Sequence, residues 1–252
     1  MKAPKLWTAC LFATFLVCTA IAGEEVGRLL DGYAKIETVT CQVRRTKEGG
    51  IGKMKFLSRV YWTHENRIHS EGITPLKRRT IADGKRLWQY AEGDPKGFSR
   101  PVEDLSEQMK ISLRMVPGTA MDHLLQLKEM EEIPLTAEWG VKQVGIQAEK
   151  QYVVLRIDQS GRLIGIRFYD NPEKEHLLSE YAYSDFIEAV PGVWIPLTHE
   201  VSVNSETSPF KETVKVDSFT ANKPVAESLF IASSFFDKGI DFVDDFAKIY
   251  PE

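Results

Sequence analysis

Alternation of apolar and polar residues with a period of two is the feature that most constrains the fold of this chain. Between Met54 and Trp62 every second residue except Ser58 is apolar, and the positions between include the charged residues Lys55 and Arg59. This period is typical of a strand with one buried face. Further segments of the same kind are Arg67–Ser70, Lys77–Ile81, Arg86–Ala91, Tyr152–Ile157, Leu163–Tyr169, Leu177–Phe186, Val193–Val203 and Glu212–Thr220.

Short turns separate most of these segments. Asp83-Gly84, Ser160-Gly161 and Pro191-Gly192 each combine residues that favour tight turns. Strands that follow one another through turns, without a helix between them, indicate an antiparallel meander and not a doubly wound parallel sheet.

Helical periodicity occurs in two places. Val26, Leu29, Leu30, Tyr33 and Ile36 follow spacings of three and four, which predicts an amphipathic helix at the start of the exported chain. The stretch from Val102 to Glu131 predicts two short helices broken at Pro117. We therefore predict an α+β fold, in which a strongly curved antiparallel sheet forms an open half-barrel with an N-terminal helix and inserted lid helices.

The first 22 residues have the pattern of an export signal. Lys2 and Lys5 flank the start of an apolar stretch that ends in Ala20-Ile21-Ala22. The stretch is shorter than the roughly 20 residues that cross a bilayer. We expect cleavage near Ala22, a periplasmic product, and one domain over residues 23–252. A lipid anchor on Cys18 is disfavoured because Val17 precedes it, where a lipobox has a small residue.

Charge and cysteine content narrow the function classes. The chain has 32 basic and 36 acidic residues, a net charge of −4, and the exported form would also lose Lys2 and Lys5. This balance argues against binding nucleic acid or an anionic membrane through bulk electrostatics. Of three cysteines, only Cys41 lies outside the signal, so an internal disulfide is excluded and Cys41 is interpreted as a core residue.

A search for catalytic and metal-binding patterns gives none. The histidines His64, His69, His123, His176 and His199 lack metal-ligand spacing. No nucleophile elbow, phosphate loop or dinucleotide fingerprint occurs, and the acidic cluster at Asp241, Asp244 and Asp245 lacks the glycine and spacing of a calcium loop. We expect a non-enzymatic monomer without a metal or cofactor.

Three parts of the chain follow the motifs of one known family. The run from Ala82 to Tyr90 resembles the "sDGk-lW-Y" hairpin of the LolA-type lipoprotein carriers and their LolB and RseB-like relatives. Residues 29–42 are similar to its opening helix and first strand, and residues 229–245 to its closing segment. One difference is that His64-Glu65 stands where the family has an Arg-Pro pair, whose arginine helps to latch the lid.

The resemblance implies a carrier of lipoprotein acyl chains in outer-membrane lipoprotein sorting, with membrane-bound donor and acceptor proteins as partners. An RseB-like envelope sensor, which acts through a protein partner, is the alternative. An acyl chain needs a concave apolar surface, although residues at these periods could equally fill a closed core. The predicted cavity and lid residues are Phe56, Trp62, Trp88, Tyr90, Met109, Leu113, Met121 and Leu125. The Pro117-Gly118 break would let residues 105–127 move as a lid.

Overall fold

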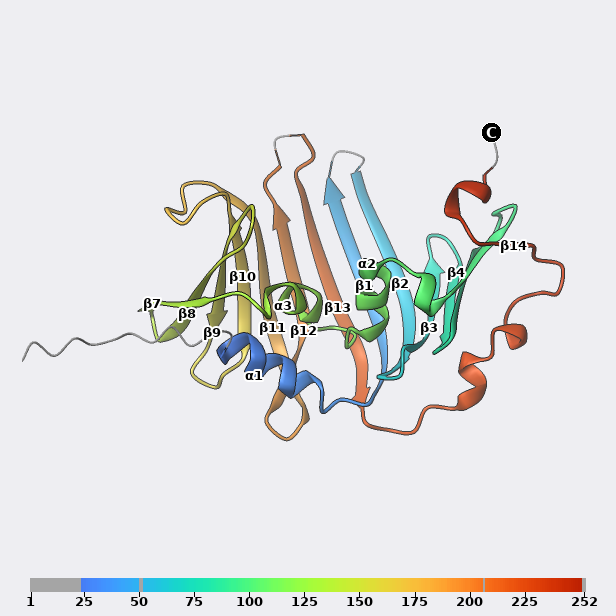
Figure 1. Ribbon diagram of the computed structural model, residues 1–252, viewed down its shortest axis with the longest axis horizontal. Helices are drawn as coiled ribbons and strands as arrows, with labels where there is room; N and C mark the ends of the chain where they lie inside the picture. The colour runs from blue at the N-terminus through green and yellow to red at the C-terminus, as the bar shows by residue number, and fades with distance from the viewer. Residues whose placement is uncertain (1–23, 50–51, 206, 251–252) are drawn as a thin grey trace, which may run out of the picture.

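The computed structural model describes residues 24–49, 52–205 and 207–250, so the predicted export signal lies outside the described residues. The described part of the chain forms one unclosed 14-stranded sheet with helices over one of its faces (Figure 1). The strands are β1 Thr38–Gly49, β2 Gly52–Thr63, β3 Arg67–Thr74, β4 Arg78–Asp83, β5 Arg86–Ala91, β6 Gly97–Pro101, β7 Glu132–Glu138, β8 Val141–Gln147, β9 Tyr152–Ile157, β10 Leu163–Tyr169, β11 Leu177–Val190, β12 Val193–Val203, β13 Phe210–Ala221 and β14 Phe242–Val243. The helices are α1 Glu24–Tyr33, α2 Glu107–Arg114 and α3 Met121–Leu127, with short 3-10 turns η1 Val102–Asp104, η2 Glu227–Phe230, η3 Ala232–Ser234 and η4 Phe246–Lys248.

The strand order shows how two meanders are joined into one open sheet. Strands β1 to β6 run outward in one direction, β13 to β7 run outward in the other, and the two meanders meet where β1 pairs with β13. All neighbouring pairs are antiparallel except the two-residue pairing of β14 with β6, which is parallel. The predicted α+β fold with an open curved sheet is confirmed, with this one parallel pairing added.

Irregularities inside the strands suit a curved sheet. The register shifts between Thr40 and Gln42 on β1 and between Glu188 and Val190 on β11. Asp185 and Ser218 also have left-handed φ angles of 55° and 54° within strands. Bulges of this kind bend a strand and increase its twist.

The predicted strand bounds agree closely with the structure at β9, β10 and β12. The turn Asp83-Gly84-Lys85, called the DGK turn below, joins β4 to β5 as a hairpin. Strands β6, β7, β8 and β14 were not predicted from the sequence pattern. The segment after Val102 forms α2 and α3, separated by a linker, Met115–Ala120, that contains Pro117. No helix in the described ranges has the length and apolarity needed to cross a membrane.

Two apolar cores lie against the sheet. The main core joins α1 and α3 to strands β1, β2 and β8 to β13, and its fully buried members include Val26, Leu124, Leu155, Ile166 and Ile195. Cys41 belongs to this core, as expected, and burial raises the pKa of its thiol to about 12. A smaller core lies under α2 and contains Ala82, Leu87, Phe98, Leu105, Leu113 and Ile249.

Candidate functional site

A cavity of about 610 Å³ lies between the sheet and the Met115–Ala120 linker. Its floor is a row of side chains that neighbour one another across five strands. Phe56 pairs with Arg45, Arg45 with Val214, Val214 with His199, and His199 with Tyr183. Because side chains on a strand alternate between faces, directly paired residues point to the same side of the sheet. This row therefore places aromatic, aliphatic and charged groups together on one face.

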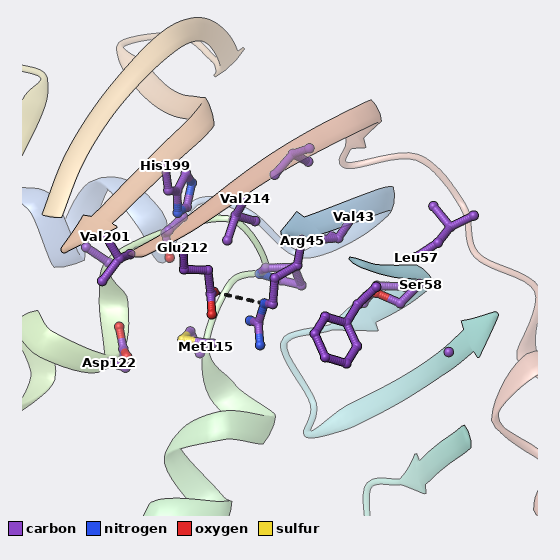
Figure 2. A pocket seen from close by; sticks show the side chains of 18 of the residues that line it. Val43, Arg45, Leu57, Ser58, Met115, Asp122, His199, Val201, Glu212 and Val214 are labelled. Atoms are coloured by element: carbon purple, nitrogen blue, oxygen red, sulfur yellow. Dashed lines mark ion pairs between the residues drawn. The ribbon is translucent and has the colours of Figure 1, made fainter. Parts of the chain in front are cut away.

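Apolar side chains form most of the cavity wall. The aliphatic members from the strands are Val43, Leu57, Val60, Ile68, Val201, Val214 and Val216. Val60 and Val216 are buried, whereas Val43 and Val214 are half-buried because the cavity stands over them. Figure 2 shows Val43, Val201 and Val214 around the same space as Met115. A concave apolar wall of this kind can shield a hydrocarbon chain from water, with a gain of about 0.8 kcal/mol for each buried methylene group.

The linker between α2 and α3 forms the opposite side. Helix α2 ends before Pro117, since proline has no N–H to donate to the carbonyl of Leu113 four residues earlier. Trp62 supplies the missing donor, and its indole Nε1–H donates to that carbonyl at 2.7 Å. Gly118 follows with a φ of +82°, and a Cβ there would approach Val216 at 3.4 Å. The linker is therefore close to the sheet at two points: next to Leu113, through Trp62, and at Gly118, through Val216.

An ion pair lies on the floor of the cavity. Arg45 Nε is 3.0 Å from Glu212 Oε1, and both side chains project from the sheet towards the linker (Figure 2). The Glu212 side chain is 14% exposed and that of Arg45 is 54% exposed. Asp122 adds a carboxylate from α3. The walls of the cavity are therefore apolar. Charged side chains face it from the sheet, at Arg45 and Glu212, and from α3, at Asp122.

Two histidines and two tyrosines occupy the side of the cavity near α3. His123 packs edge-on against Tyr181 with ring centroids 4.6 Å apart, and His199 packs edge-on against Tyr183 at 5.1 Å. Burial lowers the pKa of both histidines, so both are neutral at neutral pH. Burial also raises the pKa of both tyrosines. These rings are packed in the neutral state and extend the uncharged part of the lining.

Among the residues predicted to bind a ligand, the structure places Phe56 in the cavity lining. Trp62 is buried in the main core, and its indole N–H donates to the Leu113 carbonyl near the end of α2. Met109 and Leu113 pack in the smaller core, and Met121 and Leu125 pack against the main core. Their neighbours Asp122 and His123 are the residues of α3 that face the cavity.

The two remaining residues from the DGK hairpin lie elsewhere. Trp88 is half-buried on β5 between Ile81 and Ser99 of the adjacent strands. Tyr90 lines a second hollow of about 450 Å³, which the C-terminal residues Phe235, Phe236 and Ile240 share with β3 and β4. The sequence pattern did not predict five further lining residues, which are Arg45, Tyr181, Tyr183, His199 and Val214. These residues come together only through the pairing register of β11, β12, β13 and β1, which the sequence pattern does not contain.

Comparisons with solved structures find the same architecture in other proteins. A DUF1329 family protein from Desulfovibrio piger aligns over 83% of this chain and 95% of its own, with a TM-score of 0.55 and 11% identity. A domain described as an outer membrane lipoprotein-sorting protein, from Vibrio parahaemolyticus, aligns over 83% and 96% at a TM-score of 0.54 and 12% identity. A LolA superfamily protein from Nitrosomonas europaea aligns over 81% and 96% at 0.52 and 13% identity. The chain has a LolA-like fold. No protein-family model matches the sequence, and no curated protein matches it.

His64-Glu65 is the pair that stands where the resemblance has an Arg-Pro pair. His64 and Glu65 lie in the turn between β2 and β3, and His64 Nδ1 is 3.4 Å from the carbonyl of Glu37. Two residues before His64, Trp62 on β2 donates its indole N–H to the Leu113 carbonyl and so joins the sheet to α2.

Proposed function

We propose that this protein is a periplasmic binder or carrier of acyl chains, of the kind attached to lipoproteins. The observation that carries the proposal is the cavity of about 610 Å³ with aliphatic walls between the sheet and the Met115–Ala120 linker. Its volume falls within the roughly 300–1,000 Å³ of small-molecule sites. The LolA-like fold supports the proposal only by analogy, since a fold alone does not determine function.

The proposal is of a binding protein and not of an enzyme. It is supported by the way the titratable rings of the cavity are used: His123 and His199 pack against tyrosine rings, and His123 Nε2 is 3.9 Å from its nearest carboxylate oxygen, on Asp122. Within the residues that the structure describes, no group of three or more histidine, cysteine or acidic residues could hold a metal ion. Binding an acyl chain through apolar contacts requires neither a histidine hydrogen-bonded to a carboxylate nor a bound metal ion.

Native mass spectrometry of the protein purified gently from the periplasm tests the proposal. We expect a bound species with the mass of an acylated molecule, and displacement of a fluorescent acyl probe by added lipid. A protein partner bound without lipid would favour the RseB-like sensor. A protein that carries nothing and takes up no acyl probe would contradict the proposal.

The periplasmic location is tested separately. Amino-terminal sequencing of the exported protein should give a chain that begins near Gly23, because the pattern from Lys2 to Ala22 is that of a cleaved signal. An intact Met1, or an acylated Cys18, would contradict the prediction.

A further inference from the structure

The face of the sheet turned away from the cavity has a charge pattern of its own. Strands β2, β1, β13 and β12 are neighbours in the sheet (Figure 1). Val43 and Val214 line the cavity, so the residues next to each of them in sequence point to the opposite face. The pairing register brings six exposed basic residues of these strands together on that face. We call this set the basic face: Arg44, Lys53, Lys55, Arg59, Lys211 and Lys215.

The charge of the basic face has the opposite sign to that of the whole chain. The same side of these four strands has three acidic residues, Glu48, Glu200 and Asp217. Six basic residues against three acidic ones give this region a net charge of +3, whereas the chain has a net charge of −4. The overall charge therefore conceals a basic surface that appears only when the strands are paired.

Half of the basic face is not matched by a nearby carboxylate. Ion pairs use Arg44, which is 2.6 Å from Asp217 between Nε and Oδ2, and Lys53, which contacts Glu48. Arg59 lies at the border, with 3.9 Å between its Nη1 and an oxygen of Glu71 on β3. The other three members, Lys55, Lys211 and Lys215, are in no ion pair with another residue that the structure describes. Their ammonium groups are available to an external anion.

The surroundings of the basic face favour a charged plane over a protein partner. Helices α1, α2 and α3 pack against the other side of the sheet, so they leave this face open. The exposed large apolar residues in the described part of the chain all lie outside β1, β2, β12 and β13. A protein partner usually needs apolar and aromatic contacts at the centre of its interface. An anionic bilayer needs only cations, which can be spread over strands about 4.8 Å apart.

We propose that the basic face binds the headgroups of an anionic lipid bilayer. The acidic residues that make the whole chain negative lie mostly on other surfaces, and at about 0.1 M salt the Debye length of about 10 Å screens their repulsion. The cavity lies on the opposite side of the same strands, so docking on a bilayer and acyl binding use separate surfaces. This inference goes beyond the proposed function and does not depend on it.

Co-sedimentation of the exported protein with lipid vesicles tests the inference. One set of vesicles is phosphatidylcholine alone, and the other is an equal mixture of phosphatidylcholine and phosphatidylglycerol. The wild type should bind the anionic vesicles at about 0.1 M salt and be released at about 1 M, where the Debye length is about 3 Å. Each lysine near an anionic surface adds about fivefold to the affinity, so the double variant Lys55→Glu, Lys215→Glu should bind at least about 25-fold more weakly. The matched control is Lys35→Glu, Lys128→Glu, which changes the net charge equally at exposed positions just after α1 and α3.

Each outcome supports or overturns the inference. Equal binding to the two kinds of vesicle, or binding that persists at high salt, would overturn it. Equal losses in the two double variants would also overturn it, by showing that net charge and not this face is responsible. Binding to polyglutamate without binding to anionic vesicles would replace the bilayer by an acidic protein. Lys55→Gln with Lys215→Gln provides the test if the glutamate variant does not fold. Binding of a fluorescent acyl probe should be the same in all variants, so the proposed function is tested independently.

Discussion

One sheet serves two purposes in this molecule. Its closed half, strands β8 to β11 under α1 and α3, has side chains such as Leu155 and Ile166 that are fully buried. Its open half, the parts of β1 to β3, β12 and β13 that face the cavity, has half-buried aliphatic residues such as Val43 and Val214. The alternation of residues is the same in both halves. The difference teaches that the cover over a strand, and not the strand itself, decides whether an apolar face becomes core or cavity.

The largest expected contrast between the halves is in stability. Leu124→Ala, in the closed half, should lower the free energy of unfolding by about 2–5 kcal/mol, because Leu124 is fully buried and its removal leaves a void. Val214→Ala should cost less than about 1 kcal/mol, since one side of Val214 already faces empty space. Urea denaturation measures both. Similar losses for the two variants would mean that the open half is packed as a core.

A smaller effect is expected at the connection between the open half and its lid. Trp62→Phe retains an aromatic ring but removes the donor to the Leu113 carbonyl, which Pro117 cannot replace. The buried carbonyl left without a partner should cost about 1–3 kcal/mol. Looser attachment of α2 should also speed the release of a bound acyl probe in stopped-flow measurements. Release at the wild-type rate would show that this bond does not hold α2 against the sheet.

Lower pH should destabilise the protein through its buried histidines. Burial lowers the pKa of His69, His123 and His199 in the folded chain. In the unfolded chain the pKa of each histidine has its usual value of about 6.5. As the pH falls below that value, the unfolded chain takes up more protons than the folded one, so stability is full above about pH 7 and is lost towards pH 5. Thermal melting across this range should show the decline. His199→Gln should make it shallower, whereas the same change at exposed His176 should leave it as it is.

The sequence predicted the sheet well because strand periodicity and turn residues are local signals. It predicted α2 and α3 for the same reason, and Pro117 marked the break between them. It could not identify the cavity lining, because that depends on which strands become neighbours: Arg45 and His199 lie 154 positions apart and share one row only through β13. Leu113 and Val214 are both apolar residues on amphipathic elements, yet one is covered by Phe98 and Ile249 and the other faces the cavity.

Filling the cavity tests the account most directly. Val214→Trp places a large ring at the centre of the floor row, and Lys215→Trp places the same ring on the opposite, exposed face of β13. Binding of a fluorescent acyl probe and the melting temperature are measured for both variants beside the wild type. Val214→Trp should abolish binding at nearly unchanged melting temperature, and Lys215→Trp should bind normally. Full probe binding by Val214→Trp would contradict this account, and so would a large loss of melting temperature in that variant alone.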